Sequence, residues 1–301
     1  MSNGNYRRRL GDRADGRRIR TLTGFANFIP YIMPSRCDSL NYYEQSFEIT
    51  NADRWFRKQR ISGYKGIGAL HLFIAAYIRA IASLPALNRF VVGRHIYLHN
   101  EIEIVMTVKR ALTVYATETT IKVAFAPTDT IFDVYNKMNA AIDEVKSSDD
   151  ANGTENFANL FAKLPRPIIR FAIGCLRVGD YLGLLPKSLL DVSPFHGSMI
   201  ITDLGSLGIG PIYHHIYNFG TLPVFISFGA KRHVYELDRH GKPVERKYID
   251  GKFVMDERIV DGHYYASVFK VINKLIANPA LLEVPPEVVN EIGRASCRER
   301  V

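Results

Sequence analysis

The sequence predicts a two-layer α/β sandwich with a mixed β-sheet. Segments of helical periodicity and segments of strand periodicity follow one another in mixed order along the chain. From residue 197 on, the chain is rich in strands and contains a hairpin, and one amphipathic helix follows them. The 301 residues are 47% apolar, which is enough to bury one large core, so we expect a single domain over residues 21–290.

Two helices and four strands are expected in the first half. One helix begins at Asn51, a residue type that caps helix N-termini, and ends near residue 61. The other, residues 66–84, has few polar interruptions and stops before a proline, so it should be buried. The strands are expected at residues 43–50, 94–100, 102–109 and 119–126.

The second half begins with a helix whose apolar positions between residues 131 and 142 share one face. A surface loop at residues 146–154 and a further helical stretch at 157–185 follow. Strands are then expected at residues 198–202, 224–228, 233–237 and 244–254, with a hairpin turn at 239–242. The final helix, residues 262–276, should stop at Asn278 and Pro279.

Positive charge is concentrated at the start of the chain. The formal net charge is +9, and seven arginines against two aspartates give the first 20 residues +5. Such a basic arm could hold nucleic acid or an anionic membrane through phosphate contacts. Aromatic residues for base stacking are nearly absent, so we favour a solvated, poorly ordered arm over residues 1–20 and expect no nucleic-acid partner.

The cysteines and apolar runs point to the cytoplasm. Cys37, Cys175 and Cys297 form no pair with metal or disulfide spacing, so we expect no metal site. The Arg-rich start does not resemble a signal peptide. Residues 204–230 carry no charge and could span a bilayer by length, but their five glycines and two prolines argue against membrane insertion.

The last eleven residues, 291–301, read EIGRASCRERV. They resemble the translated read-through of a sequencing adapter. We therefore treat them as a non-native tail and leave Cys297 out of the functional argument.

A strand, a short charged turn and a helix meet at residues 253–266, FVMDERIVDGHYYA. This order resembles the HxxxDG signature of the chloramphenicol acetyltransferase and 2-oxoacid dehydrogenase acyltransferase superfamily, whose dehydrogenase branch reads DHRVxDG. Five positions match, namely Asp256, Arg258, Ile259, Asp261 and Gly262. Glu257 stands where the family has its histidine.

Three further segments resemble the same family, so that the resemblance covers about residues 21–290. They are residues 199–205 (MIITDLG), 222–229 (LPVFISFG) and 68–88, which ends in a Leu-Pro-x-Leu-Asn phrase. Thr202, in the first of these, falls where the family places a hydroxyl that donates to the oxyanion. An ordinary strand threonine is the alternative interpretation of Thr202.

The resemblance implies a chloramphenicol acetyltransferase-like fold and a homotrimer with the active site between subunits. One subunit would supply the signature residues and its neighbour the oxyanion hydroxyl. A coenzyme A thioester would be a substrate, and the acceptor would be a small molecule or a lipoyl-type group. Only about 20 residues precede the domain, so we expect no lipoyl group on this chain.

Acyl transfer from a thioester needs a base for the attacking group and a donor for the oxyanion. Glu257, Asp261 and Thr202 are the catalytic candidates, with Arg36, Arg258 and Gly262 as structural support. In the family the aspartate of Asp-Gly pairs with an arginine, for which Arg36 is the candidate here. An N-cap of the last helix is the alternative role for Asp261.

Other histidines could take the place of the missing base. An unbroken strand would separate His196 from Thr202 by about 20 Å, which excludes direct pairing. His263 begins a helix, where a structural or surface role is favoured. His214 and His215 lie in the uncharged loop and could fold over a site, with loop packing as the alternative.

Two functional hypotheses remain. The first is a coenzyme A-dependent acyltransferase that moves an acyl group to a thiol, hydroxyl or amine, with Glu257 as its base. The second is a catalytically inactive trimeric scaffold or ligand-binding homologue. Intact Asp261, Gly262 and Thr202 favour the first, and the lost histidine favours the second.

Overall fold

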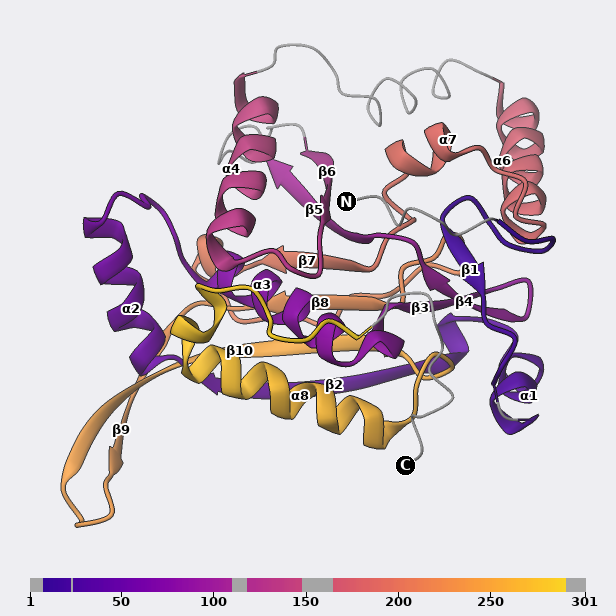
Figure 1. The fold of residues 1–301 in the computed structure, drawn as a ribbon. Coiled ribbons are helices and arrows are strands. Elements are labelled where there is room, and N and C mark those ends of the chain that lie inside the picture. Colours follow the sequence, from indigo (N-terminus) through magenta and orange to yellow (C-terminus); the bar gives the residue numbers. More distant parts are fainter. Residues whose placement is uncertain (1–7, 23, 110–117, 148–164, 291–301) are drawn as a thin grey trace.

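The computed structural model describes residues 8–22, 24–109, 118–147 and 165–290. Within them a large mixed sheet has seven strands in the order β2-β10-β8-β7-β5-β6, with β9 paired to β10. Strands β7 and β8 run parallel, as do β5 and β7, and the other pairs are antiparallel. The predicted α/β architecture with a mixed sheet is confirmed (Figure 1). The strands are β2 (Leu40–Glu48), β5 (Ile102–Lys109), β6 (Glu118–Phe125), β7 (Met199–Asp203), β8 (Val224–Phe228), β9 (Arg232–Leu237) and β10 (Pro243–Asp256).

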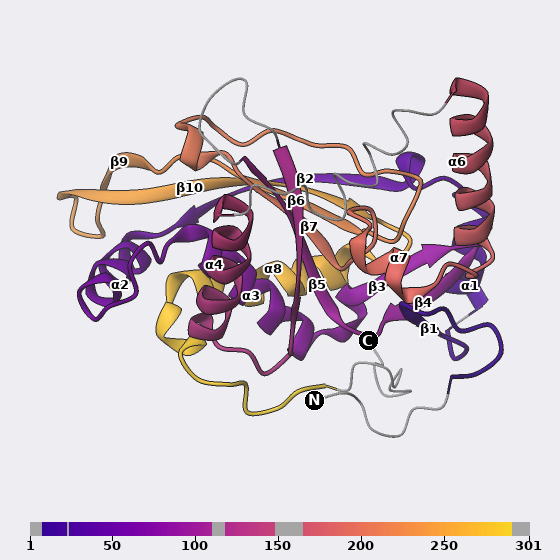
Figure 2. The same ribbon diagram turned by 90° about the horizontal axis from the view of Figure 1, so that it is seen from above.

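A layer of helices covers one face of this sheet. Apolar side chains of α3 (Ala69–Ser83), α4 (Ile131–Ser147) and α8 (Gly262–Ala277) pack on the strands in one continuous core. Helix α3 is buried nearly all round, as its uninterrupted apolar sequence predicts. Helix α2 (Thr50–Ile61) lies beside this layer (Figure 2). Its N-cap is Ile49 and not the predicted Asn51, so the helix begins two residues earlier than expected.

The opposite face of the sheet is covered by the segment between β7 and β8. Ile216 and Leu222 from this segment pack with Val105, Phe225 and Val254 from three strands. The uncharged run of residues 204–230 therefore consists of a segment that covers the sheet, followed by strand β8 of the sheet itself. Among the described residues, no helix combines the length and apolarity needed to cross a membrane.

A smaller sheet contradicts the prediction of a solvated arm from residue 8 onward. Strand β1 (Gly16–Arg18) pairs with β4 (His95–His99), which pairs with β3 (Arg89–Val92), a strand that the sequence analysis missed. Arg13 is buried and forms ion pairs with Asp15 and Asp180. This segment is basic yet ordered because backbone pairing and buried carboxylates hold it on the domain.

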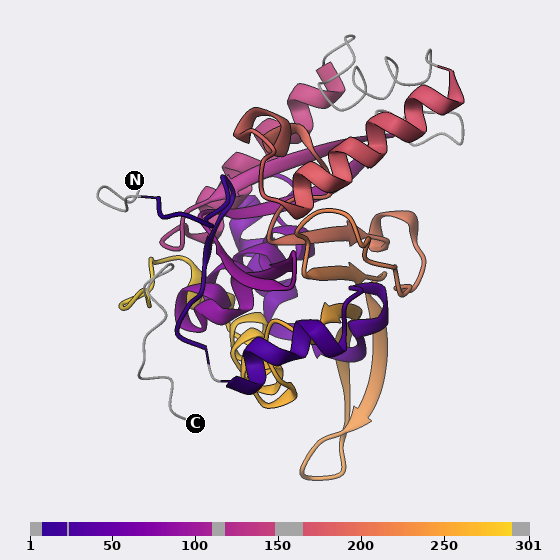
Figure 3. The ribbon, with the colours of Figure 1, turned by 90° about the vertical axis from the view of Figure 1, so that its right-hand side faces the viewer.

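Helices α1 (Gly24–Ile32), α6 (Arg166–Tyr181) and α7 (Lys187–Val192) lie at one end of the molecule (Figures 1 and 3). The β9–β10 hairpin projects at the other end (Figure 1). The predicted loop at residues 146–154 and the first part of the helical stretch at 157–185 lie mostly outside the described residues, as does the tail 291–301.

Candidate active site

The turn between β10 and α8 is built on the carboxylate of Asp256. This side chain is fully buried and accepts hydrogen bonds from Nε and Nη2 of Arg258 at 2.8 and 2.7 Å. The backbone nitrogen of Arg258 donates to the same carboxylate at 3.1 Å. The hydroxyl of Tyr265, in α8, donates to the Asp256 carbonyl at 2.9 Å. Charge-assisted bonds of this kind fix the backbone of the turn.

Arg36 contacts the same carboxylate, with its Nε 3.4 Å from Oδ2 of Asp256. The predicted pairing of Arg36 with Asp261 is therefore wrong. In the sheet register Asp256 lies opposite Leu40, only four residues from Arg36, whereas Asp261 lies beyond the turn. Asp261 is exposed and caps α8 by accepting a hydrogen bond from the backbone nitrogen of Tyr264 at 2.8 Å.

The buried guanidinium of Arg36 also joins strand β3 to the segment between β7 and β8. Its Nη atoms donate to the carbonyls of Val91, Tyr217 and Gly220 at 3.0, 2.8 and 2.8 Å. Burial lowers the pKa of Arg36 below its ordinary value, and the charge of Arg258 adds to this against the opposing effect of Asp256. The carbonyls and the carboxylate compensate for taking this charge out of water.

Glu257 projects from this turn into solvent. Its backbone nitrogen donates to the Ser39 carbonyl at 2.8 Å, but within the described residues its carboxylate has no hydrogen bond or ion pair. Arg258, the neighbouring cation, is taken up by Asp256. A carboxylate without a partner is thus presented on a fixed turn, next to Arg258 and before the start of α8 at Gly262, where a second molecule can reach it.

Thr202 lies on β7, which leads into a tight turn at Gly205. Alternation along the strand places Thr202 on the same face as Ile200, away from the helix layer. Asp203 closes the turn by accepting a hydrogen bond from the backbone nitrogen of Ser206 at 3.0 Å, and burial raises the pKa of Asp203. A Cβ on Gly205 would lie 2.7 Å from the Gly229 carbonyl oxygen, so the turn requires glycine there.

One chain does not bring Thr202 and Glu257 together. Thr202 pairs with Ser227 in β8, and Ser227 pairs with Lys252 in β10, five residues before Glu257. Five residues along a strand and two strand spacings across the sheet amount to roughly 20 Å. The two groups can act at one reacting carbonyl only if they come from different copies of the chain.

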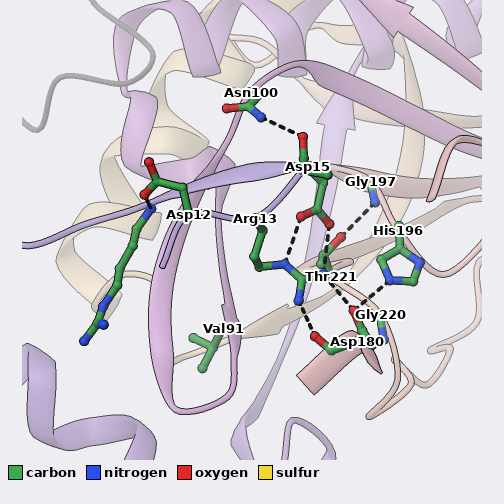
Figure 4. A network of polar contacts seen from close by, with 12 residues as sticks. Asp12, Arg13, Asp15, Val91, Asn100, Asp180, His196, Gly197, Gly220 and Thr221 are labelled. Atoms are coloured by element: carbon green, nitrogen blue, oxygen red, sulfur yellow. Dashed lines mark hydrogen bonds and ion pairs between the residues drawn. The ribbon is translucent and has the colours of Figure 1, made fainter. Parts of the chain in front are cut away.

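A second buried polar network escaped the sequence analysis (Figure 4). Asp180, at the end of α6, accepts hydrogen bonds from Arg13 Nη2 at 2.7 Å and from the Gly220 nitrogen at 3.2 Å, and lies 3.2 Å from His196 Nε2. Burial alone would raise the pKa of Asp180, but His196 and Arg13 lower it to about 2. Spacing in the sequence gave no signal, because Arg13 and Asp180 are 167 positions apart.

Gly220 connects this network to the turn that carries Glu257. Its nitrogen donates to Asp180 and its carbonyl accepts from Arg36. Its φ of +90° is in the left-handed region, and a Cβ there would lie 2.0 Å from the Phe195 carbonyl oxygen. The position of Arg36 therefore depends on close backbone packing that only glycine permits.

Within one chain, none of His196, His263 and His214 substitutes for the family's catalytic histidine at the turn that carries Glu257. His196 is buried against Asp180 and Ser193, and His263 is exposed on α8. His214 stacks on Phe225, with ring centroids 4.2 Å apart, on the sheet face that carries Thr202. Burial lowers the pKa of His214, and the neighbouring His215 adds to this. Among the described residues, no group of three or more His, Cys, Asp or Glu side chains could hold a metal ion.

Comparison with known proteins finds likeness in structure and none in sequence. No family model and no curated protein sequence matches the chain. A probable dihydrolipoamide acetyltransferase from Listeria monocytogenes superposes with a TM-score of 0.55 at 13% identity, over 86% of this chain and 94% of that one. The dihydrolipoamide acetyltransferase of Azotobacter vinelandii gives 0.55 at 13% identity, over 88% and 93%.

A chloramphenicol acetyltransferase is also similar in structure. It superposes with a TM-score of 0.53 at 12% identity, over 87% of this chain and 99% of that chain. At such identities the likeness shows the fold alone. The chain has a chloramphenicol acetyltransferase-like fold, shared with acyltransferases, as the resemblance in the sequence implied.

Proposed function

We propose that this chain is a coenzyme A-dependent acyltransferase whose active site forms between copies of the chain in a homotrimer. The observation that carries the proposal is the partner-free carboxylate of Glu257, held on a turn whose supporting residues, Asp256, Arg36 and Arg258, are all in contact. The acyltransferase-like fold supports the reaction class. The distance between Thr202 and Glu257 supports a site shared by two copies.

In this proposal Glu257 takes the proton of the acceptor as the acceptor attacks the carbonyl carbon of the thioester. The hydroxyl of Thr202 from another copy donates to the oxyanion that develops. The tetrahedral intermediate then loses coenzyme A by cleavage of the carbon–sulfur bond. The departing thiolate takes the proton back from Glu257, so the enzyme returns to its starting state.

A thiol is the acceptor that best suits a carboxylate base. The pKa of a thiol, about 8.5, lies about 4 units above the pKa of a glutamate but only about 2 units above the pKa of an imidazole. The difference makes proton transfer to glutamate roughly 3 kcal/mol harder than transfer to histidine. Hydroxyl acceptors, which are much weaker acids than thiols, would be harder still.

The second candidate is a catalytically inactive homologue that keeps the fold as a scaffold or for ligand binding. Glu257 is open to solvent in a single chain, so nothing in that chain separates its carboxylate from water. This exposure is the observation that favours the second candidate.

Thiol release from acetyl coenzyme A in the presence of dihydrolipoamide separates the two candidates. Wild-type protein should consume the thioester, and Glu257→Gln should be slower by about 10² to 10⁴. Glu257→His should be at least as active as wild type. If all three proteins leave the thioester intact, the acyltransferase proposal is wrong and the scaffold stands.

A further inference from the structure

Helix α6 exposes a continuous apolar stripe. Ile168, Phe171, Cys175, Val178 and Leu182 follow one another at intervals of three and four residues and so share one side of the helix. Phe171 is 75%, Val178 60% and Leu182 58% exposed. Figure 3 shows α6 at the surface of the molecule. A stripe of this kind is typical of an interaction surface, because folded proteins seldom leave large apolar patches exposed to water.

The same helix has a basic face without acidic residues. Arg166, Arg170 and Arg177, at intervals of four and seven residues, lie together on a second side of α6. No ion pair involves any of them in the described part of the chain. The sequence contains no aspartate or glutamate from residue 156 to residue 179. The surface of α6 is therefore complementary to a negatively charged partner.

The end of α6 is fixed to the domain. Asp180 holds it through Arg13, His196 and the backbone of Gly220. The preceding turns carry the stripe and the basic face, so both are presented in a set orientation. Because the helix is ordered before it meets a partner, binding would cost little conformational entropy.

We propose that α6 binds in the plane of an anionic lipid surface. The apolar stripe would enter the boundary between headgroups and acyl chains, and the three arginines would contact lipid phosphates. An apolar stripe combined with unpaired cations favours lipid over a second copy of the chain. A second copy of the chain carries a net charge of +9, so it matches this basic face poorly, whether the copies meet α6 against α6 or α6 against another surface.

Vesicle flotation tests the proposal. Wild-type protein should float with vesicles of phosphatidylcholine mixed with phosphatidylglycerol, weakly or not at all with phosphatidylcholine alone, and less at high salt. Phe171→Glu should lower the partition coefficient at least about tenfold, and Arg170→Glu, which reverses one charge, by about 30-fold. Tyr235→Glu is the matched control, because Tyr235 is also 75% exposed but lies on the hairpin at the other end of the molecule. It should bind like wild type.

A fluorescent label on Cys175 reports where contact occurs. In a protein with Cys37→Ser and Cys297→Ser, an environment-sensitive label at Cys175 should shift to the blue on addition of anionic vesicles. The same label on Tyr235→Cys, without Cys175, should not shift.

Failure of wild-type protein to float, or equal binding by Phe171→Glu, overturns the proposal. If Phe171→Glu instead lowers the molecular mass in solution and leaves vesicle binding unchanged, a second copy covers the stripe, and the lipid proposal is wrong.

Discussion

Arg258 and Asp256 form a two-bonded ion pair within one turn, with Nε–Oδ1 and Nη2–Oδ2 distances of 2.8 and 2.7 Å. Arg36 approaches the same carboxylate at 3.4 Å, so one buried negative charge serves two buried positive charges. Glu257 lies between the two members of the pair in the sequence, yet its carboxylate takes no part. The local electrostatics thus fix the backbone around Glu257 and leave its side chain available.

Asp256→Asn should strongly destabilise the protein. The substitution removes the negative charge and leaves two buried guanidinium groups without compensation, a loss of about 3–5 kcal/mol in the free energy of unfolding. Urea unfolding followed by circular dichroism measures it. Glu257→Gln is the control, because that exposed side chain has no partner, and should change stability by less than about 0.5 kcal/mol. Equal midpoints for the two variants would contradict the role given to Asp256.

Mixing two inactive variants should restore activity if the site lies between copies. Glu257→Gln loses the base, and Thr202→Val should lose the oxyanion donor at a cost of about 10² to 10³ in rate. After the two are unfolded together and refolded, sites that combine an intact Glu257 with an intact Thr202 should return about a quarter of the wild-type rate. The same variants refolded separately and then mixed serve as the control. Activity that stays at the level of the separate variants would place both groups outside a shared site.

Gly220→Ala should disturb both buried networks. A Cβ at Gly220 would lie 2.0 Å from the Phe195 carbonyl oxygen, whereas a Cβ at Gly63 meets nothing within 4 Å. Both glycines have positive φ, +90° and +110°, so Gly63→Ala should show the cost of backbone strain alone, about 1–2 kcal/mol. Gly220→Ala should cost clearly more in thermal unfolding and should also slow thioester turnover, because Arg36 loses its support. Equal losses would mean that the packing at Gly220 is not critical.

Stability should fall as the pH is lowered from 7 to 5, and His71 should contribute to this. Burial lowers the pKa of His71 to about 4, against a weaker opposing effect of its hydrogen bond to Asn139. The backbone nitrogen of Gly68 donates to Nδ1 of His71 at 3.3 Å, so protonation at Nδ1 would break that bond. Because the folded pKa lies below the unfolded value of about 6.5, the unfolded state takes up the proton first.

The contribution of His71 is therefore complete above about pH 6.5 and is lost as the pH falls toward 4, with about 2 kcal/mol lost by pH 5. Urea midpoints at pH 7 and pH 5 measure the loss, and His71→Gln should show a smaller difference between them. Part of the decline should remain in that variant, since burial also lowers the pKa of His99, to about 3. An unchanged pH dependence in His71→Gln would contradict this assignment.

The sequence by itself determined most elements of the large sheet and of its helix layer, and the position of the signature turn. Strand β8 runs from 224 to 228 as predicted, and α8 begins at Gly262 and is followed by Asn278 and Pro279. These predictions succeeded because periodicity, turns and caps depend on residues close in the chain. The short strands β1 and β3 were missed, since three and four residues carry too little pattern.

Only the tertiary structure decided which charges meet and which candidate residues share a site. In the folded chain Arg36 pairs with Asp256 and not with Asp261, and Arg13 pairs with Asp180. It also separated Thr202 from Glu257 by strand register. The physical reason is that a buried charge is compensated by whatever the sheet order and loop paths place beside it, and neither is encoded in local spacing. For the same reason, the sequence did not reveal that the apolar stripe of α6 is exposed; the tertiary structure shows that the core forms without these side chains.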